Sequence, residues 1–126
     1  MSILNKKQMS EEDIKLQYIT PAITSKWDVA KITMETRLTD GKINLKGNFV
    51  VREKPKRADY VLHIAPNNPI AIIEAKDNKH SISHGLQQAM AYAQKLDLPF
   101  AYSSNGDGFA EHDFLTCFSA QNRNKL

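Results

Sequence analysis

Asp59, Glu74 and Lys76 place two carboxylates and one ammonium around a predicted β-hairpin. Two apolar runs, 60–65 and 70–75, flank the sequence PNNP, which is typical of a turn. In an antiparallel pair the numbers of facing residues have a constant sum, so a turn centred on the first Pro-Asn bond puts Asp59 opposite Glu74. Because side chains alternate between faces along a strand, Lys76 points the same way as Glu74. The spacing predicts that the three charges converge on one spot.

A convergence of this kind is either a chemical centre or a cross-strand salt bridge at the end of a sheet. The salt bridge would contribute only a few tenths to about 1 kcal/mol of stability. The pattern of an acidic residue, any residue and then Lys occurs four times in the chain, so it decides nothing by itself. Only Glu74 and Lys76 follow an apolar strand with a second carboxylate in register, which makes them candidates for chemistry.

Length and composition restrict the class of protein. A chain of 126 residues forms one domain that is long enough to bury a core. Cys117 is the only cysteine, which excludes an internal disulfide and favours a reducing cytosol. No apolar run approaches the roughly 20 residues that span a bilayer, and no apolar signal core opens the chain, so we expect a soluble, cytoplasmic protein. The net charge of +3 and the sequence pI of about 9.0 permit a polyanionic partner.

A helix is predicted to begin at Ser10, after a loose N-terminal segment, 1–9. Ser10 and Asp13 resemble a capping box, and an acidic first turn suits the positive end of a helix. Pro21 fits poorly inside a helix, so we expect a bend near Thr20, with Pro21 opening a second helical turn. The predicted buried stripe of this segment consists of Ile14, Tyr18 and Ala22.

The remaining predicted elements are strands and one further helix. They are a weak strand over 27–37, a turn at Asp40 and Gly41, a half-buried strand alternating at Ile43, Leu45, Phe49 and Val51, the central hairpin, an amphipathic helix from about Ser83, a strand over 99–103 and an extended segment over 109–118. The polar tail 119–126 is expected to fray. The order is α-β-β-β-α-β, and a helix between the third and fourth strands is a right-handed crossover that makes them parallel. The fold class is α/β, a mixed β-sheet flanked by helices in a domain that spans 10–118.

Basic residues gather just before Asp59 in the sequence REKPKR. This run supplies Arg52, Lys54, Lys56 and Arg57. The ordinary interpretation of such a run is a solvated loop. The alternative is contact with phosphate groups, which its place next to the predicted carboxylates favours.

Motifs along nearly the whole chain resemble a known family. They are Glu11, Asp59-Tyr-Val-Leu, Ile-Ile-Glu74-Ala-Lys76, Gly85-Leu-Gln-Gln88-Ala-Met-Ala-Tyr92-Ala, Pro99-Phe and Ser104-Asn-Gly-Asp-Gly-Phe109. The series, over residues 10–115, is similar to the amino-terminal nuclease domain of the restriction (R) subunit of type I restriction-modification enzymes. That domain belongs to the PD-(D/E)XK, or restriction-endonuclease-like, superfamily, and the Gln-x-x-x-Tyr pair is its specific mark. Ala58 departs from the proline in the superfamily name.

The resemblance implies a Mg²⁺-dependent endonuclease that hydrolyses phosphodiester bonds of double-stranded DNA. Asp59, Glu74 and the backbone carbonyl of Ala75 would hold Mg²⁺ through oxygen atoms. Lys76 would orient the attacking water and offset negative charge. The charges that converge in the predicted hairpin agree with this chemistry.

Three further residues receive roles only through the resemblance. Glu11 would be an outer or second ligand of the metal; the alternatives are a simple helix-terminal charge and the neighbouring Glu12. Gln88 and Tyr92 would lie near the Lys76 end of the site and help to position DNA or the catalytic groups. From their spacing alone, ordinary packing of Tyr92 and a surface amide at Gln88 would be expected.

Family members continue into helicase motor domains, whereas these 126 residues contain no G-x-x-x-x-G-K-[ST] phosphate loop. ATP is therefore expected as a cofactor only of the full-length subunit, and this chain alone is expected to cut DNA poorly. The implied partners are double-stranded DNA and, through the full-length protein, the methyltransferase and specificity subunits of the type I complex. The alternative function is a non-catalytic DNA-binding or subunit-docking module on a degenerate nuclease fold. The complete set of Asp59, Glu74 and Lys76 argues against that alternative.

Overall fold

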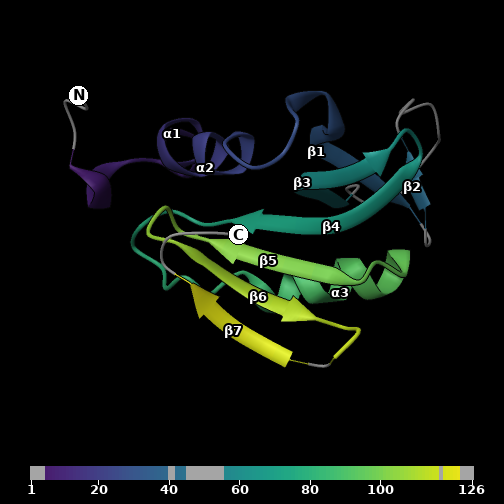
Figure 1. Ribbon diagram of the computed structural model, residues 1–126. Coiled ribbons are helices and arrows are strands. Elements are labelled where there is room, and N and C mark those ends of the chain that lie inside the picture. Colours follow the sequence, from purple (N-terminus) through teal and green to yellow (C-terminus); the bar gives the residue numbers. More distant parts are fainter. Residues whose placement is uncertain (1–4, 40–41, 45–55, 117, 123–126) are drawn as a thin grey trace.

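One β-sheet, with seven strands in the part of the chain that the structure describes, forms the centre of the protein (Figure 1). The computed structural model describes residues 5–39, 42–44, 56–116 and 118–122. The strands are β1 (Ile32–Thr39), β2 (Lys42–Asn44), β3 (Lys56–Ala65), β4 (Asn68–Ala75), β5 (Phe100–Ser104), β6 (Phe109–Asp113) and β7 (Phe118–Asn122), in the spatial order β2-β1-β3-β4-β5-β6-β7. The helical elements are η1 (Lys6–Gln8), α1 (Glu11–Ile14), η2 (Lys15–Ile19), α2 (Thr20–Thr24), η3 (Val29–Lys31) and α3 (Leu86–Leu96).

The strand directions agree with the predicted mixed sheet. β4 and β5 run parallel, with α3 as the connection between them, and the other neighbouring pairs of described strands are antiparallel. The β3–β4 hairpin has the predicted register, since Tyr60 faces Ile73 and Leu62 faces Ala71. Beyond Leu62 a bulge shifts the pairing toward the turn. The α/β class and the mixed sheet are confirmed.

The helical segment from α1 to α2 begins as predicted but continues differently. The Ser10 hydroxyl accepts the Asp13 N–H at 3.1 Å, which forms the expected capping box. As predicted, a second helical element begins near Thr20 with Pro21 in its first turn, and η2, a π-helix that the sequence does not predict, joins it to α1. In this wider turn the Thr20 N–H donates to the carbonyl of Lys15, five residues earlier.

The π-helical turn changes the face that the segment buries. A π turn takes up more residues than an α turn, so Ile14 and Ile19, five apart, lie on the same side. Both are buried together with Ile23, whereas the predicted Tyr18 and Ala22 are only partly buried. The π turn therefore adds Ile19 to the buried face, while the partly buried Tyr18 and Ala22 pack against the core cluster.

The N-terminal segment is more ordered than the sequence predicts. Asn5 caps η1, and Met9 is buried in the core. Lys6 Nζ forms a salt bridge of 2.8 Å with Asp107 Oδ1. The expectation of a loose segment is wrong from residue 5 onwards, because these residues bond to distant parts of the protein.

β7 corrects the predicted polar tail, 119–126. It pairs with β6 from Phe118 to Asn122. An edge strand is held by backbone hydrogen bonds, which polar residues form as readily as apolar ones, so composition did not reveal it. Of the strand predicted to alternate over 43–51, only residues 43 and 44 lie in β2, and the rest falls outside the described residues.

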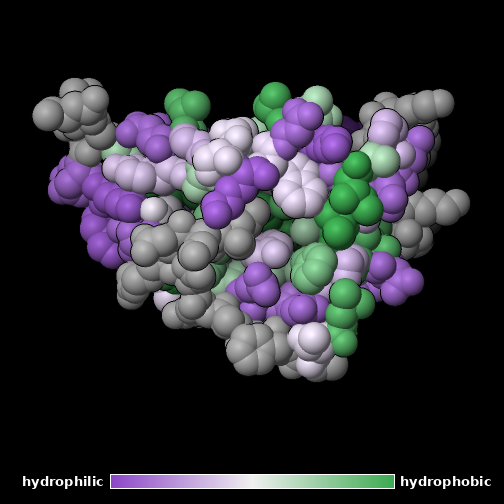
Figure 2. Space-filling model, in the orientation of Figure 1, coloured by the Kyte–Doolittle hydropathy of each residue, from purple (hydrophilic) through white to green (hydrophobic). Residues whose placement is uncertain are grey.

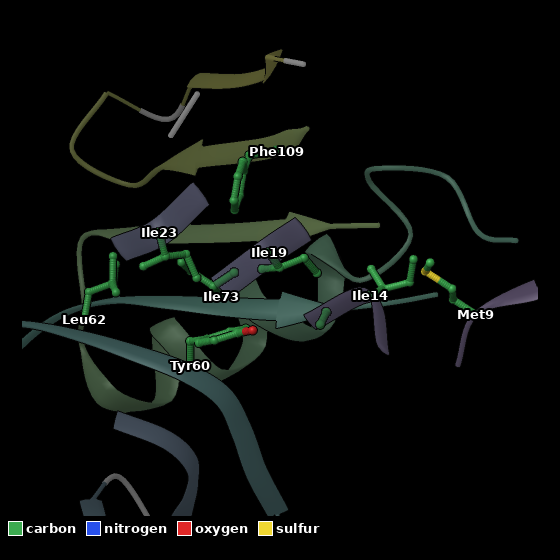
Figure 3. Close-up of a cluster of buried hydrophobic side chains, with 10 residues drawn as sticks. Met9, Ile14, Ile19, Ile23, Tyr60, Leu62, Ile73 and Phe109 are labelled. Carbon is green, nitrogen blue, oxygen red and sulfur yellow. The ribbon is translucent and has the colours of Figure 1, made fainter. Parts of the chain in front are cut away.

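Two hydrophobic clusters pack against opposite faces of the sheet. In the first, side chains of the N-terminal helical segment cover Tyr60 and Ile73 (Figure 3). In the second, Ala89 and Tyr92 of α3 pack with Ile72. Neighbouring residues on a strand point to opposite faces, so helices cover β4 on both sides. Within the described ranges, no helix is long and apolar enough to cross a membrane.

Gly106, in the turn between β5 and β6, has a φ of +93°. A Cβ at this position would lie 3.0 Å from Ile14 Cγ2 and 3.3 Å from Lys6 Cε. We predict that Gly106→Ala lowers the free energy of unfolding by more than about 1 kcal/mol, because the backbone conformation and the close contacts both disfavour a side chain. Denaturant unfolding followed by circular dichroism measures the change.

Asp97→Gly is the matched control for the Gly106→Ala variant. Asp97 ends α3 in the left-handed conformation, with a φ of 59°, and its side chain is exposed. Glycine should therefore change the free energy of unfolding by less than about 0.5 kcal/mol. A Gly106→Ala variant as stable as the wild type would contradict the described turn.

Candidate active site

The candidate site lies at a fork where β3 and β4 separate. The last backbone pair before the fork is Tyr60 with Ile73. One residue further on, the Asp59 N–H donates to Glu74 Oε2 at 3.0 Å, and the Ala75 N–H donates to Asp59 Oδ2 at 2.8 Å. Each carboxylate takes the place of a backbone acceptor from the opposite strand. The structure thus brings Asp59 and Glu74 together as the predicted register requires.

Glu74 lies deep in this fork. Only 3% of the residue is exposed, and 17% of the Asp59 side chain is exposed. Burial raises the pKa of Glu74 well above its ordinary value, and the negative charge of Asp59 raises it further. Two carboxylates in one buried position repel each other unless a proton or a cation lies between them. The pair therefore favours a bound positive charge.

Lys76 extends from the end of β4 beside the same pair. Its N–H donates to the Ser104 carbonyl at 2.9 Å, which continues the pairing with β5. A Cβ at Gly85 would lie 3.5 Å from Lys76 Cε and 3.4 Å from Glu74 Cβ, so the start of α3 rests on both side chains. Against burial and the charge of Asp59, the positive charge of Lys76 acts to lower the pKa of Glu74. The three predicted charges meet at one site.

Glu11, the first residue of α1, reaches the site from the helical layer. Burial raises the pKa of Glu11, the negative charge of Asp59 raises it further, and Lys76 and Lys15 act in the opposite direction. The side chain of Glu12 is 74% exposed and pairs with Lys15 instead. Glu11 is therefore close enough to Asp59 and Lys76 for their charges to act on its pKa.

Lys15 is a residue of this site that sequence reasoning missed. Its side chain is 2% exposed, and its Nζ lies 3.3 Å from Glu12 Oε1, 3.7 Å from Glu35 Oε2 and 3.6 Å from Asp59 Oδ1. Burial acts to lower the pKa of Lys15, but the negative charges of Asp59, Glu35 and Glu12 outweigh it and raise the pKa. Lys15 is therefore a buried ammonium in contact with one of the two central carboxylates.

The sequence carries no clear signal for either Lys15 or Glu35. With an α-helical period, Lys15 follows the buried Ile14 by about 100° around the axis, which places it away from the core stripe. Lys15 continues α1, since its N–H donates to the carbonyls of Glu11 and Glu12, and its long side chain is nevertheless buried among acidic groups. Glu35 lies within β1 in a left-handed backbone conformation, with a φ of 51°, which no local pattern predicts.

Gln88 and Tyr92 are joined on α3 by a hydrogen bond of 2.7 Å from Gln88 Nε2 to the Tyr92 hydroxyl. Tyr92 packs with Ile72, which shares a face of β4 with Glu74 because side chains alternate. The start of α3 rests on Lys76, as its contact with Gly85 shows. The helix that carries both residues therefore covers the Glu74 side of the sheet, as expected, and their roles remain predictions.

Part of the predicted basic run lies within the described residues. Lys56 and Arg57 begin β3 and are exposed, just ahead of Asp59. Arg52 and Lys54 fall outside the described residues. The structure thus places two basic side chains on the surface of the strand that leads into the fork.

Ser103 of β5 anchors the loop between β4 and α3. It is fully buried, and its hydroxyl donates to the Ile82 carbonyl at 2.8 Å and accepts the Gly85 N–H at 3.0 Å. In the parallel pairing Ser103 faces Glu74. The loop that positions the start of α3 is tied to the sheet directly beside the site.

An apolar pocket of about 270 Å³ lies away from these charges, on the α2 side of the sheet. It is lined by Lys26, Trp27, Leu62, Ile70, Ala71, Phe100 and Tyr102. Figure 2 shows hydrophobic residues gathered toward the right of the view and hydrophilic residues toward the left, where the N-terminal segment lies. None of the described residues that line the pocket carries a carboxylate, and none belongs to the candidate site.

Comparisons with known proteins identify the family. Residues 28–98, more than half of the chain, match a protein-family model. That family model is described as the type I restriction enzyme EcoKI endonuclease subunit second domain. The chain belongs to the family of type I restriction enzyme endonuclease subunits. The resemblance drawn from the sequence motifs is confirmed.

Two relatives of this family agree with the sequence and the fold. The type I restriction enzyme EcoAI endonuclease subunit of Escherichia coli is 44% identical over 115 residues, which make up 90% of this chain and 14% of that protein. A solved fragment assigned to an HsdR subunit of a type I restriction enzyme from Vibrio vulnificus YJ016 has a TM-score of 0.78 at 37% identity, over 92% of this chain and 23% of that chain. The chain therefore spans a small part of its curated relative. The shared architecture confirms the expected restriction-endonuclease-like α/β core.

Ser103→Ala should lower the free energy of unfolding by about 1–3 kcal/mol, because it leaves the Gly85 N–H and the Ile82 carbonyl without their partner. Ser81→Ala, in the exposed part of the same loop, is the matched control and should change it by less than about 0.5 kcal/mol. Denaturant unfolding gives both values, and hydrogen exchange of the Gly85 amide reports on the loop itself. Equal stability and equal exchange in the two variants would contradict the described anchor.

Proposed function

We propose that this chain is a Mg²⁺-dependent endonuclease module that hydrolyses phosphodiester bonds of double-stranded DNA. It would act within the restriction subunit of a type I enzyme whose motor domains use ATP. The observation that carries the proposal is the meeting of Asp59, Glu74 and Lys76 at the fork between β3 and β4. Membership of the endonuclease subunit family supports the same class of reaction.

The residues at the fork fit a hard divalent cation. Asp59 and Glu74 offer carboxylate oxygens from adjacent strands, and their mutual repulsion favours a cation. The carbonyl of Ala75 would be a third oxygen ligand, and Glu11 would be an outer one. In the described part of the chain no three His, Cys, Asp or Glu side chains form a metal-binding group, but two carboxylates suffice for Mg²⁺ because it keeps several water ligands. When bound, Mg²⁺ supplies a Lewis acid that activates water and offsets negative charge on the phosphate.

Lys76 would place its positively charged ammonium group at the reacting phosphate, in addition to the charge of Mg²⁺. Its side chain lies beside Glu74 and under the start of α3, which limits its movement. In the proposed reaction its ammonium donates to the attacking water and orients it. The same charge offsets the negative charge that develops on the phosphoryl oxygens.

DNA would approach along the face that carries α3. Gln88 and Tyr92, hydrogen-bonded to each other on that helix, would position the DNA or the catalytic groups. The basic run 52–57 would contact phosphates on either side of the cleaved bond, and its described members Lys56 and Arg57 are exposed.

The rest of the restriction subunit completes the proposed function. Because the chain covers 14% of its curated relative, ATP use and contacts with methyltransferase and specificity subunits belong to the full-length protein. We place that assembly in the cytoplasm. The DNA sequence that it recognises would be selected by another subunit.

Asp59→Ala, Glu74→Ala and Lys76→Ala should each lower the rate of DNA cleavage by about 100-fold or more in the assembled enzyme, because each removes a charge from the reacting centre. A nicking assay on supercoiled plasmid, with saturating Mg²⁺ and ATP, measures the rates. Lys31→Ala, on the exposed η3, is the matched control and should cleave like the wild type. Thermal melting should stay near the wild-type value for all four variants. Normal cleavage by any of the first three would show that the site is wrongly assigned and favour a non-catalytic module.

Gln88→Ala and Tyr92→Phe should slow DNA cleavage, because each removes one partner of their hydrogen bond and a group that would meet the DNA. Neither would ligate the metal, so Mg²⁺ affinity should stay within a few-fold of the wild type. Cleavage assays and calorimetric titration with Mg²⁺ measure the two effects separately. Gln94→Ala, at an exposed position of the same helix, is the control. Full cleavage by both variants, or loss of Mg²⁺ binding in either, would contradict the proposed roles.

A further inference from the structure

Lys15 holds one oxygen of Asp59 from the helical layer. Its Nζ lies 3.6 Å from Asp59 Oδ1, while Asp59 Oδ2 accepts the Ala75 N–H at 2.8 Å. A carboxylate with one donor can still rotate about its side-chain bonds. Lys15 on η2 and the Ala75 amide on β4 contact different oxygens of this carboxylate, which limits its rotation.

Packing fixes the position of Lys15 itself. The helical segment docks on β3 through a hydrogen bond of 2.7 Å between the hydroxyls of Thr20 and Tyr60. The Lys15 ammonium lies 5.6 Å from the centre of the Tyr60 ring, within reach of a cation–π interaction. Ile14, the preceding residue, is fully buried. Lys15 is the first residue of η2, a π-helical turn, and such turns are found frequently at functional sites.

Two further acids hold the ammonium, at 3.3 Å from Glu12 and 3.7 Å from Glu35. The register between β1 and β3 puts Glu35 opposite Asp59. Its φ of 51° is uncommon for a residue other than glycine, and such conformations cluster at functional sites. A strained position in the neighbouring strand therefore presents a carboxylate to Lys15. The side chains of Glu12 and Glu35 are 74% and 51% exposed, so both keep their solvation without Lys15.

We propose that Lys15 is a positioning residue of the metal centre, which keeps the Asp59 carboxylate in the orientation that binds Mg²⁺. This role rests on the proposed nuclease function. Groups that hold a metal ligand typically change metal affinity by about 10- to 100-fold without touching the metal. If Lys15 instead competed with Mg²⁺ for Asp59, its removal would strengthen Mg²⁺ binding. The sign of the change in affinity distinguishes the two roles.

Lys15→Met removes the ammonium and keeps an unbranched, flexible side chain. Calorimetric titration of the 126-residue chain with Mg²⁺ should show an affinity about 10-fold weaker than that of the wild type. Lys6→Met is the matched control, because Lys6 also forms an ion pair from the N-terminal segment, with Asp107 at 2.8 Å, but makes no contact with Asp59. It should bind Mg²⁺ like the wild type. Asp59→Asn should lose most of the affinity.

The outcomes separate the role of Lys15 from the proposed function. Affinity equal to or tighter than the wild type in Lys15→Met, with weak binding by Asp59→Asn, would overturn only the positioning role. A wild-type chain that binds no Mg²⁺ would overturn the nuclease proposal and this role with it. If Lys15→Met does not fold, the Glu35→Gln variant provides a second test of the role of Lys15. It loosens the hold on Lys15 and should weaken Mg²⁺ binding by a few-fold, and unchanged affinity would overturn the role.

Discussion

Two carboxyl groups side by side, Glu74 buried and Asp59 partly buried, are the constraint on which the rest of this structure depends. Asp59 and Glu74 face each other where β3 and β4 separate, and each would be costly to bury alone. Backbone amides from both strands and two ammonium groups, Lys76 and Lys15, offset this cost. The other acids around these ammonium groups are Glu11, Glu12 and Glu35. The excess of negative charge is the physical reason for a divalent cation in the proposed function.

Elements from both faces of the sheet converge on this fork. On one face, α3 begins directly over Glu74 and Lys76, because Gly85 has no side chain, and Ser103 ties the preceding loop to β5. From the other face, the N-terminal helical segment contributes Lys15, which contacts Asp59. The geometry of the site is set by packing between distant parts of the chain rather than by a single local motif.

The sequence alone was sufficient to predict the structure wherever a local pattern determines it. The hairpin turn and the alternation of side chains predicted that Asp59 faces Glu74, and the β-α-β order predicted that β4 and β5 are parallel. It was insufficient where packing overrides the local pattern. The burial of Lys15 depends on its contacts with Glu35 and Asp59 of the sheet, and the order of residues 5–9 depends on distant partners such as Asp107. β7 was missed because an edge strand needs only backbone partners, which composition does not show.

The most direct test of a cation site at the fork is to locate the ion. Mn²⁺ accepts the same carboxylate, carbonyl and water ligands as Mg²⁺, and its anomalous X-ray scattering identifies it in a crystal. Crystals of the chain prepared with saturating Mn²⁺ should show an anomalous peak bonded to carboxylate oxygens of both Asp59 and Glu74. A fork without an anomalous peak, or a peak bound only to other residues, would contradict the proposed metal centre.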